Sequence, residues 1–174
     1  MTGKINILQG DITKVEVDAI VNAANRALSG GGGVDGAIHR AAGPSLLKAC
    51  RQLGMCETGQ AKITPGFNLP ASYVIHAVGP VWYGGHQDEA RLLTSCYQAS
   101  LKLAVENGVK RIAFPAISCG AYGYPVDEAS EIAIETMKTF LEQDEVIEEI
   151  LLVLYDRKTY QAYLRTFRKH TSGS

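Results

Sequence analysis

The sequence predicts an α/β domain in which helices cover both faces of a mostly parallel sheet. Short runs rich in valine, isoleucine and aromatic residues alternate along the chain with longer segments of helical period. The chain has 174 residues, of which 46% are hydrophobic and 20% are charged, which is enough to bury the core of one domain. Because no internal repeat or linker divides it, we expect a single domain over residues 1–169.

The strands of this sheet are expected where β-branched and aromatic residues gather between turn signals. Six segments fit, and they are Lys4–Leu8, Asp18–Asn22, Gln60–Thr64, Tyr73–Val78, Arg111–Phe114 and Glu149–Tyr155. The second, fourth, fifth and sixth are rich in valine, isoleucine and aromatic residues, which is typical of buried strands. We therefore expect these four strands to be covered on both faces.

Five helices are expected between and after the strands, at Gly36–Ala42, Pro44–Gln52, Glu89–Glu106, Val126–Gln143 and Arg157–Arg168. The fourth begins after Pro125 and has Asp127 and Glu128 in its first turn, where carboxylates suit the helix dipole. Its apolar residues recur at helical spacing, so one face should pack on the sheet. The closing residues His170–Ser174 are polar and small, and we expect a short tail there.

Composition and charge exclude several classes of protein. A formal net charge of -1 and a pI near 6.4 provide no basic surface for nonspecific nucleic-acid binding. The N-terminal residues lack the apolar core of a signal peptide, and no run approaches the roughly 18 apolar residues of a membrane span. The four cysteines show no CxxC spacing and form no zinc-like pattern with the four histidines. We therefore expect a cytoplasmic protein without membrane, nucleic-acid, metal or other cofactor partners.

Two glycine-rich segments are candidates for binding phosphate. One is Ser29-Gly30-Gly31-Gly32-Gly33-Val34-Asp35-Gly36, and the other is Ser118-Cys119-Gly120-Ala121-Tyr122-Gly123-Tyr124. Each follows a predicted strand and precedes a predicted helix, so backbone N–H groups of the two loops could clamp a diphosphate beyond the strand ends. The alternative for each loop is a flexible surface turn. Neither loop is a GxGxxG or Walker A motif, and the P-loop lysine is absent, which disfavours a kinase or NTPase.

Polar residues beside the first glycine loop could contact a sugar and activate water. Asn25 follows a predicted strand and offers a donor and an acceptor for hydroxyl groups, whereas Asn22, at the strand end, is better explained as a cap or turn residue. Asp35 and His39 are four residues apart and so share one helix face. The carboxylate could orient or activate water, and the imidazole could hold the carboxylate. The alternative is a carboxylate favoured by the helix dipole beside a surface histidine.

Two other residues, Asp11 and Tyr155, have two interpretations each, and His76 has one. Asp11 could accept a hydrogen bond from an adenine amine or cap a helix with Thr13. Tyr155 could form an aromatic wall for a base or close the core. His76 lies in an apolar strand and is expected to be a satisfied core histidine.

These motifs together resemble the macrodomain family, in particular its MacroD-type branch, which includes bacterial O-acetyl-ADP-ribose deacetylases. The resemblance runs from about Ile5 to Tyr163, and the linked spacing is more specific than any one motif. The residues that carry it are Gly10-Asp11-Ile12-Thr13, Val21-Asn22-Ala23-Ala24-Asn25, Gly30–His39 and Pro115-Ala116-Ile117-Ser118-Cys119-Gly120.

The resemblance implies a three-layer α/β/α fold around a mixed sheet, with ADP-ribose over the strand ends. Asp11 would bind the adenine amine, Ile12 would line the adenine pocket, and Tyr155 or Asp156 would flank the base. Asn25 would bind the distal ribose beside Asp35. Backbone N–H groups would hold the diphosphate, and they belong to Gly31, Gly32, Gly33 and Val34 in the first loop and to Ser118, Cys119, Gly120, Ala121 and Tyr122 in the second. Tyr122 would also close over the distal ribose.

The second loop departs from the family pattern because it reads Ser-Cys-Gly where this branch commonly has Ser-Thr-Gly. Since that loop should act through its backbone, we expect binding to survive. Cys119 is not expected to be a nucleophile, because no histidine is near it in sequence and the family does not use one.

The expected activity is hydrolysis of ester-linked groups at the distal ribose of ADP-ribose. The expected partners are ADP-ribose, its O-acetyl ester and mono-ADP-ribosylated proteins. Water would be activated either by Asp35 or by a phosphate oxygen of the substrate, with Asn25 and Asp35 as the catalytic pair. The alternative is a non-enzymatic module that only reads ADP-ribose on proteins.

Overall fold

The computed structural model describes residues 3–172 of the chain. Among these residues the chain forms six strands, β1 Lys4–Gln9, β2 Ala19–Ala23, β3 Ala61–Pro65, β4 Tyr73–Ala77, β5 Arg111–Phe114 and β6 Glu149–Leu154. The helices are η1 Ile12–Lys14, a single 3-10 turn, and α1 Gly33–Ala42, α2 Pro44–Leu53, α3 Glu89–Glu106, α4 Val126–Gln143 and α5 Arg157–Ser172. Every predicted strand is present, with ends that differ by at most one residue.

The strands form one sheet in the order β1-β6-β5-β2-β4-β3. Neighbouring strands from β1 to β4 run parallel, and β3 alone runs antiparallel, against β4. The sheet is therefore mixed and mostly parallel, as predicted. Its topology places the carboxyl ends of five parallel strands at one edge, where open α/β sheets bind their ligands.

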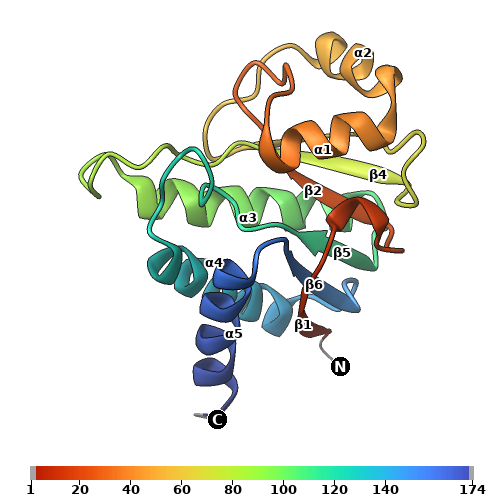
Figure 1. Cartoon of the computed structure of the whole chain (residues 1–174). Coiled ribbons are helices and arrows are strands. Elements are labelled where there is room, and N and C mark those ends of the chain that lie inside the picture. Colours follow the sequence, from red (N-terminus) through yellow and green to blue (C-terminus); the bar gives the residue numbers. More distant parts are fainter. Residues whose placement is uncertain (1–2, 173–174) are drawn as a thin grey trace.

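Helices cover both faces of the sheet (Figure 1). Helices α1 and α2 lie on one face, and α3, α4 and α5 lie on the other. The strands are buried on both sides because successive side chains point to opposite faces. In β2, Ala19 and Val21 join the apolar cluster with α3 and α4, whereas Ile20 joins the cluster with α1 and α2. The three-layer α/β/α architecture expected from the sequence is confirmed.

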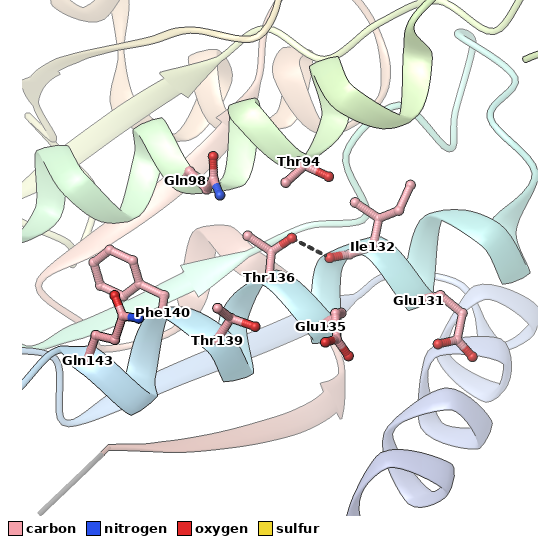
Figure 2. Close-up of a pocket in the computed structure, with 9 residues that line it drawn as sticks. All are labelled: Thr94, Gln98, Glu131, Ile132, Glu135, Thr136, Thr139, Phe140 and Gln143. Carbon is pink, nitrogen blue, oxygen red and sulfur yellow. Dashed lines mark hydrogen bonds between the residues drawn. The ribbon is translucent and has the colours of Figure 1, made fainter. Parts of the chain in front are cut away.

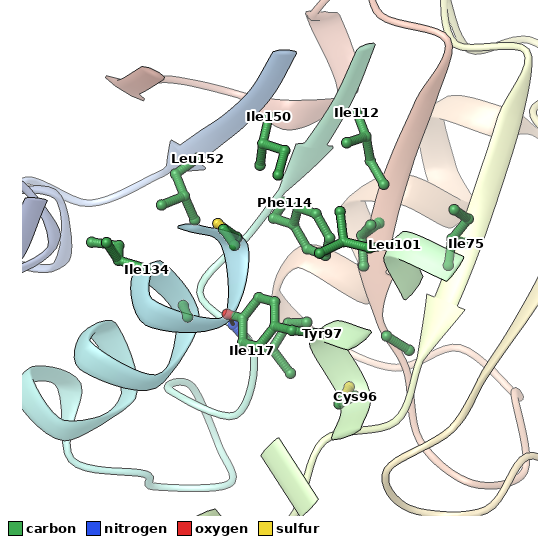
Figure 3. Packing of buried hydrophobic residues seen from close by; sticks show 14 of the residues in the cluster. Ile75, Cys96, Tyr97, Leu101, Ile112, Phe114, Ile117, Ile134, Ile150 and Leu152 are labelled. Atoms are coloured by element: carbon green, nitrogen blue, oxygen red, sulfur yellow. Dashed lines mark hydrogen bonds between the residues drawn. The ribbon is translucent and has the colours of Figure 1, made fainter. Parts of the chain in front are cut away.

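The larger apolar cluster fixes the start of the second glycine loop. Figure 3 shows Phe114 of β5 and Tyr97 of α3 packed together, and their ring centroids lie 5.3 Å apart with the ring planes tilted. The Tyr97 hydroxyl accepts a hydrogen bond from the backbone N–H of Ile117 at 3.4 Å. Because Tyr97 and Ile117 are fully buried, the chain leaves β5 along a path that the core determines.

Three helix ends differ from the prediction, and one of them, the end of α2 at Leu53 instead of Gln52, differs by a single residue. Helix α1 begins at Gly33 rather than Gly36, because the Gly36 N–H donates to the Gly32 carbonyl at 3.1 Å and closes a turn over glycines that carry no sequence signal for a helix. Helix α5 continues to Ser172 rather than ending at Arg168. His170, expected in a polar tail, is helical, and its Nε2 lies 2.8 Å from Glu131 Oε2 on α4. Residues 173–174 of the expected tail lie outside the described residues.

No helix in the described part of the chain combines the length and apolar character needed to cross a bilayer.

Candidate functional site

The candidate site lies at the edge where the five parallel strands end. The first glycine loop follows β2 and the second follows β5, and β2 and β5 are hydrogen-bonded neighbours. The other segments at this edge follow β1, β6 and β4. Both glycine loops therefore lie at the same end of the molecule, on adjacent strands.

The second loop is held against the segment that follows β4. Gly79 packs so closely on this loop that an added methyl group would overlap Ser118 Oγ and lie 2.6 Å from Ile117 Cγ2. The backbone N–H of Trp82 donates to the Tyr122 carbonyl at 2.9 Å, and the rings of Trp82 and Tyr124 lie 4.6 Å apart. Because β4 lies beyond β2 in the sheet, the second loop passes across the end of β2 toward the first loop.

The first loop is compact and leads directly into α1. Gly30 and Gly33 have φ values of +80° and +58°, a conformation that side chains disfavour. Gly36 lies against the backbone of Gly31, and a methyl group at Gly36 would overlap the Gly31 carbonyl oxygen. The first backbone N–H groups of α1, at Gly33, Val34 and Asp35, have no intrahelical partner, as at every helix start. They leave a place for an anion beside the glycines.

Asp35 lies in the first turn of α1 and is 7% exposed. Its Oδ1 accepts a hydrogen bond from Asn22 Nδ2 at 2.8 Å, and His39 Nε2 lies 3.3 Å from the same oxygen. The other oxygen faces the first loop, since a methyl group at Gly31 would lie 3.5 Å from Oδ2. Burial raises the pKa of Asp35, and the Asn22 hydrogen bond and His39 oppose that rise. One oxygen is thus anchored while the other is turned toward the loop.

Asn22 is the main correction to the sequence reasoning, which favoured a cap or turn role. It lies within β2, is fully buried, and donates from Nδ2 to Asp35 and toward His76 Nδ1 at 3.2 Å. The sequence did contain a signal for this burial. Side chains of a strand alternate between the two faces of the sheet, which places Asn22 on the same face as Ile20, under α1. An amide on a buried strand face requires a polar partner.

Asn25 shapes the first loop in this structure. Its Nδ2 donates to the Gly30 carbonyl at 3.0 Å and to Ser29 Oγ at 3.1 Å, and its Oδ1 accepts from the Ser29 N–H at 3.1 Å. The predicted contact of Asn25 with a ribose stays a prediction. The bonds place its amide within the loop that would receive the sugar.

The segment after β1 gives Asp11 the capping role that the sequence allowed. Asp11 Oδ1 accepts from the Thr13 N–H at 2.9 Å and from Thr13 Oγ1 at 2.7 Å. Ile12 is buried in the apolar cluster beneath α1, to which Val34 also packs. The adenine contacts expected of Asp11 and Ile12 stay predictions.

After β6, Tyr155 is 82% exposed, so its alternative role of closing the core is wrong. Asp156 instead accepts from the Thr159 N–H at 3.0 Å at the start of α5. Exposure of a large aromatic ring at the ligand edge is consistent with a base-stacking surface. The stacking of a base on Tyr155 stays a prediction.

Cys119 of the second loop points toward the core rather than toward a base. Its Sγ lies 3.6 Å from the buried Tyr163 hydroxyl, and burial raises its pKa to about 11. A thiol in that environment stays protonated and is a poor nucleophile. The neighbouring Gly120 and Ala121 are exposed, and Tyr122 is half-buried.

A hollow of about 480 Å³ lies between α3 and α4 (Figure 2). Its described lining includes the carboxylates of Glu131 and Glu135 and no lysine or arginine. None of the residues that line the hollow belongs to either glycine loop. Its charge makes it unsuitable for a diphosphate.

Within residues 3–172 no three potential metal ligands cluster. The absence of a metal cofactor stays a prediction.

Residues 21–133 match the family described as the Macro domain. A macro domain-containing protein of Chlorobaculum tepidum is 57% identical over 159 residues, which are 91% of this chain and 92% of that protein. A Salmonella gallinarum protein named O-acetyl-ADP-ribose deacetylase is 53% identical over 169 residues, which are 95% of this chain and 94% of that protein.

The solved structure of an Oceanobacillus iheyensis macrodomain with ADP superposes on this chain with a TM-score of 0.95, and the two sequences are 41% identical. The match covers 99% of this chain and 94% of that one. The matched family, the close relatives and the shared architecture agree with the motifs at the strand ends, and the chain belongs to the macro domain family.

Proposed function

We propose that this protein hydrolyses ester-linked groups at the distal ribose of ADP-ribose. The substrates would be O-acetyl-ADP-ribose and proteins mono-ADP-ribosylated on acidic residues. The observation that carries the proposal is the placement of Asp35, whose Oδ1 is anchored by Asn22 while Oδ2 faces the first glycine loop. A carboxylate held in this way beside a diphosphate cradle is suited to act on the sugar next to that diphosphate.

The two loops supply the binding part of the proposal. The start of α1 offers unpaired N–H groups at Gly33 and Val34, and the exposed Gly120 and Ala121 lie on the loop after the neighbouring strand. Backbone donors of this kind suit a diphosphate without requiring a cationic side chain. Relatives named O-acetyl-ADP-ribose deacetylase, about half identical in sequence, support the same substrate class.

In the reaction, a water oxygen attacks either the ester carbonyl or the anomeric carbon. Attack at the carbonyl breaks the bond to the ribose oxygen, which takes a proton, and releases the free acid and ADP-ribose. Asp35 Oδ2 would accept the proton from that water, and the raised pKa of this carboxyl makes it a better base than an exposed aspartate. The rival base is a phosphate oxygen of the substrate.

The test is release of acetate from O-acetyl-ADP-ribose and of ADP-ribose from a glutamate-modified protein. Calorimetry should show that Asp35→Ala still binds ADP-ribose. Its turnover of both substrates should be about 10²- to 10⁴-fold slower, the usual effect of losing a base. Asp127→Ala is the matched control, because Asp127 is also a first-turn carboxylate but lies exposed on α4. Unchanged turnover in Asp35→Ala would mean that a phosphate oxygen of the substrate, and not Asp35, accepts the proton from the water. Binding without release on either substrate would establish a reader.

A further inference from the structure

A buried row of polar side chains extends from Asp35 across the sheet. Asn22 Nδ2 contacts Asp35 Oδ1 at 2.8 Å and His76 Nδ1 at 3.2 Å, and His76 Nε2 lies 3.0 Å from Thr64 Oγ1. The four residues come from α1, β2, β4 and β3 in that order. Asn22 and His76 are fully buried, and Thr64 is 4% exposed. Only Asp35, at one end of the row, faces the glycine loop.

The hydrogen-bond donors in this row can be assigned from the distances. One hydrogen of Asn22 Nδ2 goes to the Asp35 carboxylate and the other to His76 Nδ1, which must therefore accept. A neutral imidazole that accepts at Nδ1 carries its proton on Nε2, so His76 donates to Thr64 Oγ1. Burial lowers the pKa of His76 to about 4, and His39 adds to this effect. The ring is thus neutral near pH 7.

The opposite orientation of the Asn22 amide is unfavourable. If the amide were turned over, its oxygen would face Asp35 Oδ1 at the position that Nδ2 now occupies, and two acceptors would oppose each other. The NH₂ group would then take the place of Oδ1, a buried atom with no hydrogen-bond partner among residues 3–172. A buried amide that loses its partners is costly. Two acceptors, Asp35 Oδ1 and His76 Nδ1, therefore hold the NH₂ group of Asn22 in this orientation together.

We infer that His76 and Thr64 are positioning residues for the Asp35 carboxylate, acting through the side chain of Asn22. Thr64 accepts from the Nε2–H of His76 and so stabilises the tautomer whose Nδ1 accepts from Asn22, and this acceptor helps to hold the Asn22 NH₂ group toward Asp35. The inference rests on the proposed function, because it assigns the row to the reaction at Asp35. The two residues lie on β3 and β4, outside both glycine loops.

Two other titratable groups face the row. His39, from α1, lies 3.3 Å from Asp35 Oδ1, and Cys50, from α2, has its Sγ 3.6 Å from His76 Nε2. Burial raises the pKa of Cys50 to about 11, with a further rise from Asp35, so this thiol is uncharged near pH 7. As a weak acceptor, sulfur does not replace the Thr64 hydroxyl. Both groups are left unchanged in the variants below.

The first measurement is the pKa of Asp35 from carboxyl ¹³C NMR, in protein without ligand. Thr64→Val removes the acceptor with little change of shape, so Nε2–H loses its partner and Nδ1–H can form instead. A protonated Nδ1 no longer accepts from the Asn22 NH₂ group and opposes it, which weakens the hydrogen bond from Asn22 to Asp35, so the Asp35 pKa should rise by about one pH unit. Thr64→Ser keeps a hydroxyl and should restore the parent value. Histidine ¹⁵N spectra, assigned with His76→Gln, should show Nε2–H in the parent.

The second measurement is the steady-state rate on O-acetyl-ADP-ribose. Thr64→Val should lower kcat about tenfold, because the Asp35 carboxylate is held less firmly in position. KM and the ADP-ribose Kd should stay within about twofold, because Thr64 and His76 lie on β3 and β4, outside both glycine loops. The acidic limb of the kcat profile should move to higher pH with the Asp35 pKa. Thr136→Val is the matched control, since Thr136 is an equally buried threonine whose Oγ1 donates to the Ile132 carbonyl within α4.

The outcomes separate this inference from the proposed function. An Asp35 pKa that is the same in Thr64→Val and in the parent overturns the inference, even if the protein does not turn over. A shifted pKa with parental kcat also overturns it. A parent protein that neither binds ADP-ribose nor releases acetate contradicts the proposed function, and the NMR result still decides whether Thr64 and His76 orient the carboxylate.

Discussion

Two buried polar atoms at the candidate site, Asn22 Oδ1 and Ser118 Oγ, have no hydrogen-bond partner among the described residues. A buried polar group without a partner typically costs about 1–3 kcal/mol. Ser118 also has a φ of +68°, in the left-handed region that costs a side chain about 1–3 kcal/mol. Both residues lie beside the glycine loops. At the residue scale, stability is therefore lost where the loops must keep a particular shape.

Gly79 tests whether the shape of the second loop matters for binding. Gly79→Ala places a methyl group on Ser118 Oγ and Ile117 Cγ2, so the loop must move. We expect the ADP-ribose affinity measured by calorimetry to fall on the order of tenfold or more, equivalent to about 1.4 kcal/mol.

The control for this prediction is Gly66→Ala in the turn between β3 and β4. There an added methyl group would overlap the Ala71 carbonyl oxygen, a similar clash at the opposite edge of the sheet. Gly66→Ala should lower the melting temperature and leave the affinity of the folded protein unchanged. Equal loss of affinity in both variants would show that general destabilisation, not the loop, is responsible.

The sequence predicted some site residues better than others, and the reason is the range of the interactions. Asp35 and His39 were paired correctly because both lie in one helix, at a spacing of four residues. The role of Asn22 depends on α1 packing over β2, and its bond to His76 depends on the register of β2 with β4. No local pattern contains that information. Single-sequence reasoning therefore chose the commonest role of an asparagine at a strand end.

At the element scale, the segment between β4 and α3 is tied together by one carboxylate. Glu89, the first residue of α3, is 1% exposed and accepts hydrogen bonds from the N–H groups of Tyr83 at 2.8 Å, Gly85 at 2.9 Å and Gln87 at 2.6 Å. Burial opposes its ionisation, but these N–H groups lower its pKa to about 2. Since Trp82 bonds to Tyr122, this segment supports the second glycine loop.

Glu89→Gln should loosen this segment without unfolding the protein. An amide offers one acceptor oxygen instead of two, and its NH₂ group opposes a backbone N–H. Amide hydrogen exchange at Tyr83, Gly85 and Gln87 should become faster, and ADP-ribose affinity should fall less than in Gly79→Ala. Glu106→Gln, at the exposed last residue of the same helix, should leave both unchanged. Unaltered exchange in Glu89→Gln would mean that the carboxylate does not hold the segment.

Element boundaries were predictable where apolar periodicity or a cap marks them. Helices α3 and α4 have the predicted ends, and η1 was missed as a helix although its cap, Asp11 with Thr13, was considered. The start of α1 was missed because glycines carry no helical signal, and the end of α5 because Lys169 and His170 pair with Glu131 on another helix. A local backbone bond from Gly36 to Gly32 sets the first of these ends, and tertiary contacts set the second.

At the scale of the whole molecule, the two faces of the sheet differ in the polarity of the side chains buried against them. The face under α3, α4 and α5 is built from an extended apolar cluster, whereas the face under α1 and α2 combines an apolar cluster with the row from Asp35 to Thr64. A buried neutral histidine lies at the middle of that row. Lowering the pH should therefore destabilise the packing of α1 and α2 on the sheet face that carries the candidate site.

The free energy of unfolding should fall as the pH falls from about 6.5 to about 4. Because burial lowers the pKa of His76 from 6.5 to about 4, the unfolded chain binds a proton in that interval that the folded protein does not. One such proton gives a slope of about 1.4 kcal/mol per pH unit. Asp35 acts in the opposite direction, since its raised pKa lets the folded state take up a proton first.

Urea denaturation of the parent and of His76→Gln isolates the contribution of His76 to the pH dependence of the unfolding free energy. The difference in unfolding free energy between the parent and His76→Gln should change with pH between 6.5 and 4. Above about pH 7.5 this difference should stay constant. A difference that is constant at every pH would contradict a neutral buried His76.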